Sequence, residues 1–481
     1  MNPLSLDLAV LALGLVLVFL EAFNDGKEKA FLGWIATAGI GVIFALSFLV
    51  SPQEIVATQL VPFYTADALA IFFKRFALGT TLIVLIMAME FRPILSHYLP
   101  TSVRNGGVGE FFALPVFTCL GLMWMASAVD FIMIFVSLEL VTISFYVLVA
   151  YMRRNNPSLE AGTKYLILSA LSTGFFVYGI TWVFGVTGKT NLGEVGQAIL
   201  RLPVENQTAL LFGLALLLVG LGFKIAAVPF QLWVPDVYQG APTPITAFLS
   251  VGSKAAGFVL LIRILNPFIA APATSGKVQL VLVALALLSL VYGNLTAMPQ
   301  LNLKRLLAYS SIAHAGYLLM ALASFQNGHF KEATVSFYLA GYLLMTLLAF
   351  LVMVVVNRVA GGDSIAHFNG LGQRAPWLAF GLTVAMLSLA GIPFTAGFMG
   401  KFFVFVDAVE AHQWLLVIVG IITVGAGFYY YLKVVRAMYW NPAKNNEPIQ
   451  AGRLTQVTVG VLVFLIVALG VYPQPVLNLL K

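Results

Sequence analysis

One stretch decides the fold: residues 211–265 read LFGLALLLVGLGFKIAAVPFQLWVPDVYQGAPTPITAFLSVGSKAAGFVLLIRIL. Two long apolar runs each carry a single lysine, Lys224 and Lys254, and the prolines Pro229 and Pro235 interrupt the first run. A charge at the centre of a membrane helix costs about 2.5–3.5 kcal/mol and usually has a function. A proline break at membrane depth frees backbone groups that only protein or water can satisfy. The stretch therefore predicts a broken membrane helix beside an ion site.

The whole chain is too apolar for a soluble protein, since 60% of its 481 residues are hydrophobic and only 9% are charged. Runs of about 20 apolar residues, long enough to cross a bilayer, recur along it. The composition predicts an all-α polytopic membrane protein with about fourteen transmembrane helices. The predicted windows are 4–23, 30–50, 67–91, 110–129, 130–152, 158–186, 207–240, 244–265, 277–298, 301–323, 331–357, 377–410, 414–437 and 454–474.

Basic residues are concentrated in alternate loops and explain the net charge of +7 better than a nucleic-acid partner does. One set of loops holds 14 lysines and arginines, and the other set holds 6. The positive-inside rule puts the first set in the cytoplasm, so both termini are predicted on the outer side. The single cysteine, Cys119, excludes a disulfide framework, a cysteine-ligated cluster and a zinc site.

Two windows, 207–240 and 377–410, are each about 34 residues long where about 20 suffice. The second window repeats the pattern of the first, with Pro393 at its middle and Lys401 beyond it. The windows lie five spans apart and cross in opposite directions, which predicts two inverted five-helix repeats, each with a broken helix. The predicted parts are N-terminal helices in 1–109, a first repeat in 110–265 with its break near 224–235, a second repeat in 277–437 with its break near 391–401, and a C-terminal loop and helix in 438–481.

Five titratable side chains are predicted near the middle of the bilayer: Glu139, Lys224, Lys254, His314 and Lys401. Each also has a structural interpretation: a carboxylate bonded to a hydroxyl, a lysine that reaches the interface, a counter-ion or a packed histidine. Their depth favours proton transfer, because a buried Glu–Lys pair that can separate is a proton switch. Lys224 is the predicted partner of Glu139, and His314 is a predicted relay.

Polar residues near His314 predict a polar seam along its helix, formed by Tyr309, Ser310 and Ser311. Lys164 lies only about six residues into its window. A structural or interfacial role is therefore supported for Lys164 as well as a functional one.

Three charged residues of the third window, Asp67, Lys74 and Arg75, have a spacing that places them on one helix face. We interpret them as structural charges that pair with one another or with other subunits.

Several long blocks resemble the antiporter-like membrane subunits of proton-pumping NADH:quinone oxidoreductase (respiratory complex I), and above all its subunit N family. The resemblance covers nearly the whole chain. The blocks are GLGFKIAAVPFQLWVPDVYQGAPTP at 220–244, LKRLLAYSSIAHAGYLL at 303–319, MLSLAGIPFTAGFMGKFFVF at 386–405, FYYYLKVV at 428–435 and GVYPQP at 470–475.

The resemblance implies roles for particular residues. The family's acidic residue of span five falls on Glu139, and its histidine of span ten falls on His314. Its lysine of span six falls on Lys164, and its lysine of the span after the first break falls on Lys254. Its lysines at the first and second breaks fall on Lys224 and Lys401. It also implies that NADH, flavin, iron–sulfur clusters and quinone belong to partner subunits, and that this chain holds no cofactor or metal. The implied partners are other membrane-arm subunits, including sister antiporter-like subunits, within a bacterial inner membrane.

The function implied is that of a proton-translocating subunit of an NADH:quinone oxidoreductase, driven by redox chemistry in other subunits. The chain would be part of an enzyme without holding a redox centre. Two alternatives remain: a subunit of a multi-subunit Na+/H+ antiporter, and a non-pumping membrane scaffold.

Overall fold

A computed structural model of the chain describes residues 2–23, 29–52, 62–99, 108–443 and 447–480. Over these ranges the regular structure is helical, and β pairing is limited to isolated bridges. Four basic residues of the predicted loops, Lys27, Arg104, Lys444 and Lys481, lie outside the described ranges.

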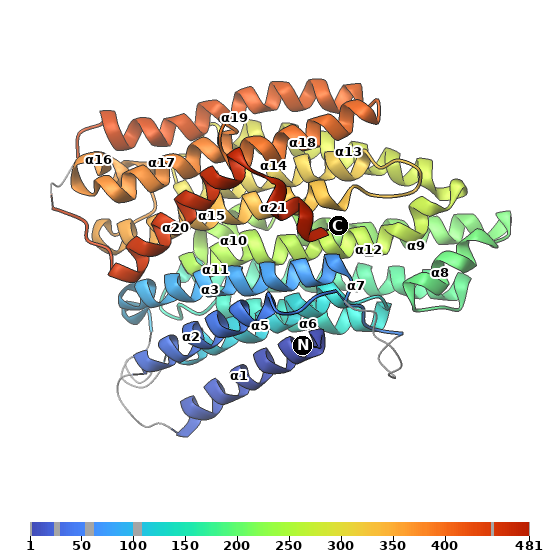
Figure 1. Cartoon of the computed structure of the whole chain (residues 1–481), viewed down its shortest axis with the longest axis horizontal. Helices are drawn as coiled ribbons and strands as arrows, with labels where there is room; N and C mark the ends of the chain where they lie inside the picture. Colours follow the sequence, from blue (N-terminus) through green and yellow to red (C-terminus); the bar gives the residue numbers. More distant parts are fainter. Residues whose placement is uncertain (1, 24–28, 53–61, 100–107, 444–446, 481) are drawn as a thin grey trace.

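The main helices follow one another along a compact bundle (Figure 1). They are α1 (Pro3–Phe23), α2 (Ala30–Ser47), α3 (Ala68–His97), α5 (Glu110–Ser127), α6 (Phe131–Val149), α7 (Asn156–Thr187), α8 (Leu192–Leu200), α9 (Gln207–Ile225), α10 (Val234–Gly240), α11 (Thr243–Phe248), the π-helical segment η2 (Leu249–Ser253), α12 (Lys254–Ala270), α13 (Pro272–Ala297), α14 (Leu303–Ala323), α15 (Glu332–Ala360), α16 (Leu371–Arg374), α17 (Pro376–Ala390), α18 (Ala396–Glu410), α19 (Trp414–Trp440), α20 (Arg453–Val471) and α21 (Gln474–Leu477). Short 3-10 turns lie at Val204–Asn206, Ile365–Phe368 and Asn478–Leu480.

The chain is a polytopic all-α membrane protein, as predicted. Twelve helices of the described residues are long and apolar enough to cross a membrane, and two further apolar helices, Phe31–Ser47 and Pro376–Ala390, are shorter. Every predicted window contains a helix, and the two long windows each contain a pair, α9 with α10 and α17 with α18. The total of about fourteen crossings and the inverted repeats stay predictions.

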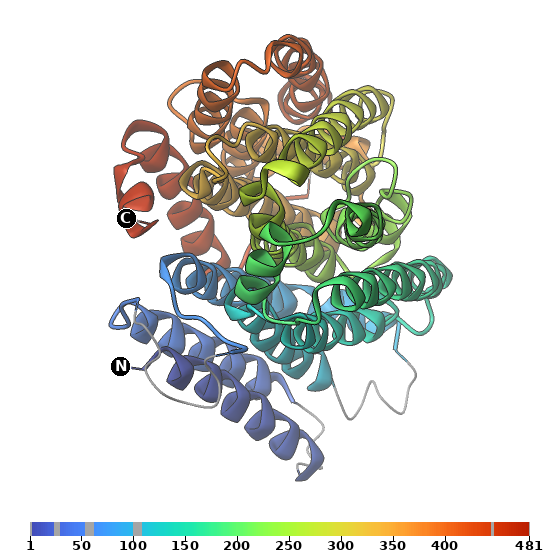
Figure 2. The same ribbon diagram turned by 90° about the vertical axis from the view of Figure 1, so that its right-hand side faces the viewer.

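The helices at the centre of the bundle are those that carry Lys254 and His314. All of the spanning part of Thr243–Ala270 and of Leu303–Ala323 is buried, whereas only 28% of that of α7 is. Figure 2 shows α1 and α2 in blue at one edge of the bundle and α18 and α19 in orange at the opposite edge. Lys254 and His314 are thus shielded from lipid by the protein itself.

Glycines allow two helix pairs to approach closely. A Cβ atom at Gly179 of α7 would lie 2.7 Å from the backbone nitrogen of Leu217 in α9. A Cβ atom at Gly293 of α13 would lie 2.5 Å from the backbone nitrogen of Ala313 in α14. Small residues of this kind bring membrane helices together, because lipid and leucine are equally apolar and tight packing provides the attraction.

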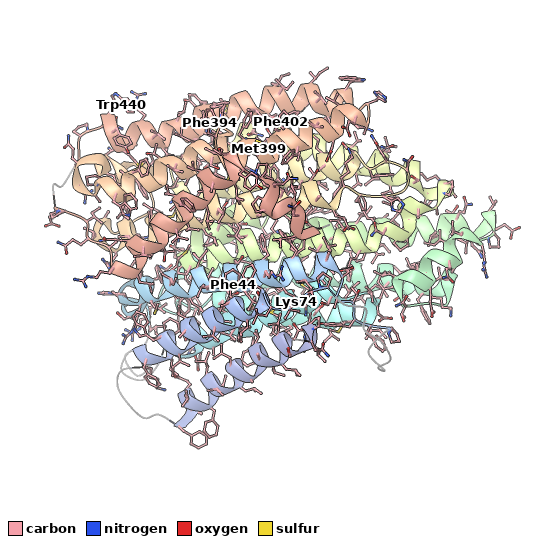
Figure 3. The ribbon with its side chains drawn as sticks, viewed as in Figure 1. Phe44, Lys74, Phe394, Met399, Phe402 and Trp440 are labelled. Carbon is pink, nitrogen blue, oxygen red and sulfur yellow. The ribbon has the colours of Figure 1, made fainter. Side chains whose placement is uncertain are left out.

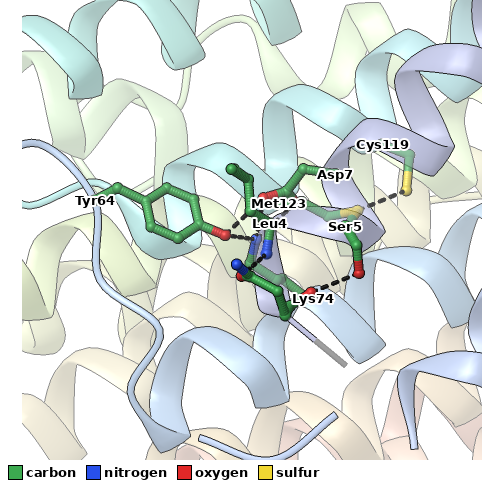
Figure 4. A network of polar contacts seen from close by, with 8 residues as sticks. Leu4, Ser5, Asp7, Tyr64, Lys74, Cys119 and Met123 are labelled. Atoms are coloured by element: carbon green, nitrogen blue, oxygen red, sulfur yellow. Dashed lines mark hydrogen bonds and ion pairs between the residues drawn. The ribbon is translucent and has the colours of Figure 1, made fainter. Parts of the chain in front are cut away.

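The three charges of α3 do not pair with one another. Lys74 is fully buried and contacts Asp7 of α1, at 2.5 Å and 2.6 Å, and the hydroxyl of Tyr64 at 2.5 Å (Figure 4). Asp67 caps α3 and forms an ion pair with Arg263 at 2.9 Å. Arg75 donates to backbone carbonyls at the end of α2.

The prediction of mutual pairing was wrong because seven residues of helix separate Asp67 from Lys74 by about 10 Å along the axis. Each charge therefore found a partner on another element. Burial raises the pKa of Asp67, but the hydrogen bonds and charge of Arg263 outweigh burial, so the pKa of Asp67 is lowered.

Candidate functional site

The first break separates α9 from α10. It begins after Ile225, which directly follows Lys224. Ala226 ends α9 in the left-handed conformation, with a φ of 63°. The freed backbone groups find protein partners: the indole of Trp233 donates to the carbonyl of Phe223 at 3.0 Å, and the hydroxyl of Ser289 accepts from the amide of Val228 at 3.0 Å. The break is therefore held open by side chains, as a membrane interior requires.

Lys224 lies in the last turn of α9 and is 7% exposed. Its ammonium donates to the hydroxyls of Thr142 in α6, at 2.6 Å, and Ser169 in α7, at 3.2 Å. The carboxylate of Glu139 accepts from the hydroxyl of Thr173 at 3.0 Å.

Glu139 and Lys224 thus face the same α6–α7 seam, but these two described residues form no direct ion pair. Thr142 lies one turn after Glu139 on α6, and Ser169 lies one turn before Thr173 on α7. Hydroxyls both donate and accept, so they can relay a proton or release either partner.

Lys254 begins α12 directly after the π-helical segment η2 and is 2% exposed. Such segments are rare and are frequent at functional sites. The Nζ atom of Lys254 donates to both the carbonyl and the hydroxyl of Ser311 in α14. The hydroxyl of Ser311 also contacts that of Tyr238 in α10, at 3.3 Å. Tyr238 therefore connects the second half of the first broken helix with the site of Lys254.

His314 follows Ser311 by nearly one turn of α14 and is 2% exposed. Its Nδ1 atom lies 2.7 Å from the hydroxyl of Tyr338, and its Nε2 atom lies 3.2 Å from that of Tyr431. Ser310 is hydrogen-bonded to Tyr431 as well. Both ring nitrogens thus have a hydroxyl partner, which is the arrangement a relay needs.

The second break separates α17 from α18 and contains Gly391, with a φ of 89°. Lys401 reaches back from α18 and donates to the carbonyls of Leu389 and Ala390, each at 2.9 Å. These carbonyls end α17, where a helix presents its negative pole. A Cβ atom at Gly391 would lie 3.0 Å from Cδ of Lys401, so both the conformation and the space require glycine.

Two aromatic side chains near the second break are exposed. Phe394, in the break itself, and Phe402, on α18, are 73% and 49% exposed and are labelled in Figure 3. Lys401, which is 6% exposed, points inward and lies 5.2 Å from the ring centre of Tyr317. The second broken helix therefore turns its lysine toward the bundle and its aromatic rings toward lipid or a neighbour.

Lys164 lies apart from the buried row. Its side chain is 40% exposed and forms ion pairs with Glu160 at 2.6 Å and Asp236 at 2.7 Å. Asp236 also pairs with Arg305 at 2.9 Å. The structure thus gives Lys164 a place in a surface ion network.

The predicted polar seam is present in part. Ser310 and Ser311 belong to it, but the ring of Tyr309 packs at a tilt beside that of Tyr292, with ring centres 6.3 Å apart. Sequence reasoning missed the buried tyrosines, among them Tyr342, whose hydroxyl lies 2.9 Å from that of Ser250.

A signal for these tyrosines existed: Tyr338 and Tyr342 are spaced i, i+4 in an otherwise apolar run and so share a helix face. Among the described residues, no group of three or more His, Cys, Asp or Glu side chains is placed to hold a metal ion.

Comparison with known proteins identifies the family. Residues 128–427 match the family model described as "NADH:quinone oxidoreductase/Mrp antiporter, TM". The chain belongs to this family. The part of the chain that matches the family model contains Glu139, both breaks and Lys401. The N-terminal helices and α20 lie outside it.

Relatives within this family are similar over their whole length. The NADH-quinone oxidoreductase subunit N of Desulforamulus reducens is 39% identical over 98% of this chain and 95% of its own. That of Moorella thermoacetica is 38% identical over 99% and 97%. Respiratory complex I from Thermus thermophilus contains a chain with a TM-score of 0.81 and 31% identity, covering 98% of both chains. A chain of the Mrp complex from Dietzia has the same TM-score at 20% identity and shows the fold alone, over 100% of this chain and 96% of that one.

Proposed function

We propose that this chain is a proton-translocating membrane subunit of an NADH:quinone oxidoreductase. The observation that carries the proposal is the row of ionisable and hydroxyl groups that runs from the half-buried Glu139 on α6, through the buried Lys254 and His314 on the central helices, to the buried Lys401 at the second break. The relatives at 34–40% identity, all named NADH-quinone oxidoreductase subunit N, support this assignment over a cation antiporter.

Protons are passed along the row by groups that each accept and release one proton. Lys224 holds a proton as its ammonium while Glu139 is ionised nearby, because an opposite charge favours the charged form. When that charge is withdrawn or moved, Lys224 releases its proton toward the neutral amine of Lys254. His314 accepts a proton on one ring nitrogen and releases the other proton from the second nitrogen, so it passes charge without rotating. Lys401 is the last acceptor in the row.

Two steps lack a direct hydrogen bond among the described side chains: Lys224 to Lys254, and His314 to Lys401. We propose that water molecules complete them, because buried water is stable where it has two to four polar partners. The energy comes from NADH oxidation and quinone reduction in partner subunits, and this chain holds no redox centre. The partners include sister antiporter-like subunits, in a bacterial inner membrane with both termini on the periplasmic side.

The test is proton transport per NADH oxidised, measured with the assembled complex in closed vesicles. Lys224→Ala is expected to remove this chain's share of the protons moved per NADH, while the sister subunits keep theirs. Lys224→Arg keeps the positive charge but cannot release its proton, so it is expected to fail as well. Lys189→Ala is the control, because its side chain is 50% exposed and pairs with Glu194 at the surface.

Normal transport in both Lys224 variants would establish the scaffold function. Proton uptake that continues without NADH or quinone but needs a sodium gradient would establish the antiporter function.

A further inference from the structure

A long hollow runs between α3 and α20 on one side of the bundle, outside the region that carries the buried row. α20 packs against α3 and α15, and Figures 1 and 2 both show the red C-terminal helices beside the blue α3. The hollow has a volume of about 370 Å³, and its walls are mostly apolar, including Phe44, Phe76, Leu344 and Val461. Arg75 also lines it, but its guanidinium already donates to backbone carbonyls at the end of α2. Phe44, from α2, is labelled in Figure 3 next to this side of α3.

A second hollow, of about 420 Å³, continues the first toward the C-terminal end of α3. The two share Ile86, and the second is lined by Trp34, Arg92 and Arg453 among others. From Gly79 to Arg92 the helix covers 13 residues, about 20 Å at 1.5 Å per residue. The combined groove is therefore apolar for most of a leaflet's depth and carries two guanidinium groups at one end.

Within the described residues, the two arginines at this end have no acidic partner. Glu90 also lines the second hollow, but Arg358 at 2.6 Å and Thr455 at 2.6 Å already hold its carboxylate. Neither Arg92 nor Arg453 forms an ion pair or hydrogen bond through its side chain with the part of the chain that the structure describes. The end of the groove thus carries two uncompensated positive charges beside a neutralised carboxylate.

We propose that this groove binds one anionic phospholipid, with its phosphate between Arg92 and Arg453 and an acyl chain along α3 toward Gly79. Guanidinium groups bind phosphate through paired, charge-assisted hydrogen bonds, and basic pockets between membrane helices on the cytoplasmic side bind anionic headgroups. Trp34, which is 59% exposed, lies near the N-terminal end of α2, and tryptophan is enriched at membrane interfaces. The basic residues at this end belong to the loops predicted to be cytoplasmic.

A transmembrane helix of a neighbouring subunit fits the groove less well. The apolar hollow extends along α3 from Phe72 to Ile86, which are about 21 Å apart, and a neighbouring helix lying along it would leave the two arginines at its end without an anion. An acyl chain needs no polar partner, whereas the two arginines require an anion.

The test uses the intact complex, purified in mild detergent, and measures bound phospholipids by native mass spectrometry and by extraction. The double variant Arg92→Gln with Arg453→Gln is expected to lose about one anionic phospholipid per complex. Arg154→Gln with Arg436→Gln is the matched control, since both side chains are exposed basic groups away from the groove and lie in loops of the same predicted set. NADH oxidation by each preparation shows that the complex has assembled.

A second variant tests the apolar part of the groove. Gly79→Leu leaves both arginines in place, and its Cβ would meet Phe44 at an ordinary 3.5 Å, so we expect the protein to fold with the groove filled. The bound lipid should again be lost. Unchanged lipid content in both variants, retention of a lipid without net charge, or a cross-link from Val461→Cys to a neighbouring subunit's helix would each overturn the proposal.

Discussion

The two broken helices hold their lysines in different ways. At the first break, Lys224 precedes the interruption and donates to two side-chain hydroxyls, with the carboxylate of Glu139 in the same seam. At the second break, Lys401 follows the interruption and donates to two backbone carbonyls, at the end of α17. Lys224 therefore has hydroxyl partners that can rotate and an acid nearby. Lys401 is held by the fixed carbonyls of a helix terminus.

The difference suggests a division of labour. Hydroxyls and a carboxylate can change their orientation or charge, so the first break is suited to receive a signal from a neighbouring subunit. Backbone carbonyls at a helix end keep their dipoles, so the second break offers a constant environment for a proton acceptor. We infer that control is exerted at Glu139 and Lys224, while Lys401 responds to what reaches it.

The largest effect is expected from Gly391→Val, which strains the backbone at the second break. A β-branched residue at a φ of 89° is strained by about 1–3 kcal/mol, and its side chain would displace Lys401 from its two carbonyls. Proton transport per NADH should be lost in whatever complex assembles. Gly425→Ala is the control, because nothing lies within 4 Å of its added Cβ. Normal pumping by Gly391→Val would show that Lys401 does not need this position.

A smaller effect is expected from Glu139→Gln, which removes the acid that only the first break possesses. Two unit charges interact by several kcal/mol at most in a partly buried site, so a loss of about ten-fold in proton transport is expected. Glu139→Asp should retain part of the transport, because the charge remains while its position changes. Equal activity of Gln and Asp variants would contradict a role for the charge.

A change of about three-fold is expected from Thr142→Val, which removes one hydroxyl partner of Lys224 but keeps the shape of the side chain. A hydrogen bond to a charged group contributes about 1.5–3 kcal/mol, and Ser169 remains to offset part of the loss. The matched control is Thr163→Val on the exposed side of α7, whose hydroxyl bonds only its own helix. The initial rate of vesicle acidification measures the difference, and equal rates would show that the hydroxyl is dispensable.

The smallest effect on pumping is expected from Lys74→Met, although Lys74 is more deeply buried than Lys224, Lys254 and Lys401. Lys74 forms a direct ion pair with Asp7, which neither lysine at the breaks does with any carboxylate that the structure describes. This ion pair holds α1 to α3. Loss of one partner leaves a buried charge, so the amount of assembled complex should fall, by a destabilisation of about 3–5 kcal/mol. The protons moved per NADH should not change. A lower ratio in the assembled fraction would extend the row of proton carriers to this pair.

Sequence reasoning located the lysines and the prolines of the breaks because charges and prolines are rare in apolar runs and have few explanations there. It located the hydroxyls of Ser310 and Ser311 near His314 but missed Tyr338 and Tyr431, because these tyrosines lie on other helices and their contact with His314 depends on helix packing. Nor could it pair Lys74 with Asp7, which is 67 residues away in the chain. The depth of a residue can be estimated from its position in a run, but its partner depends on how the helices pack.

The most direct measurement is a structure of the assembled complex at a resolution that shows ordered water. We predict water molecules that join Lys224 to Lys254, and His314 to Lys401, in hydrogen-bonded files. Closely packed, dry side chains in both gaps would contradict proton transfer along this row.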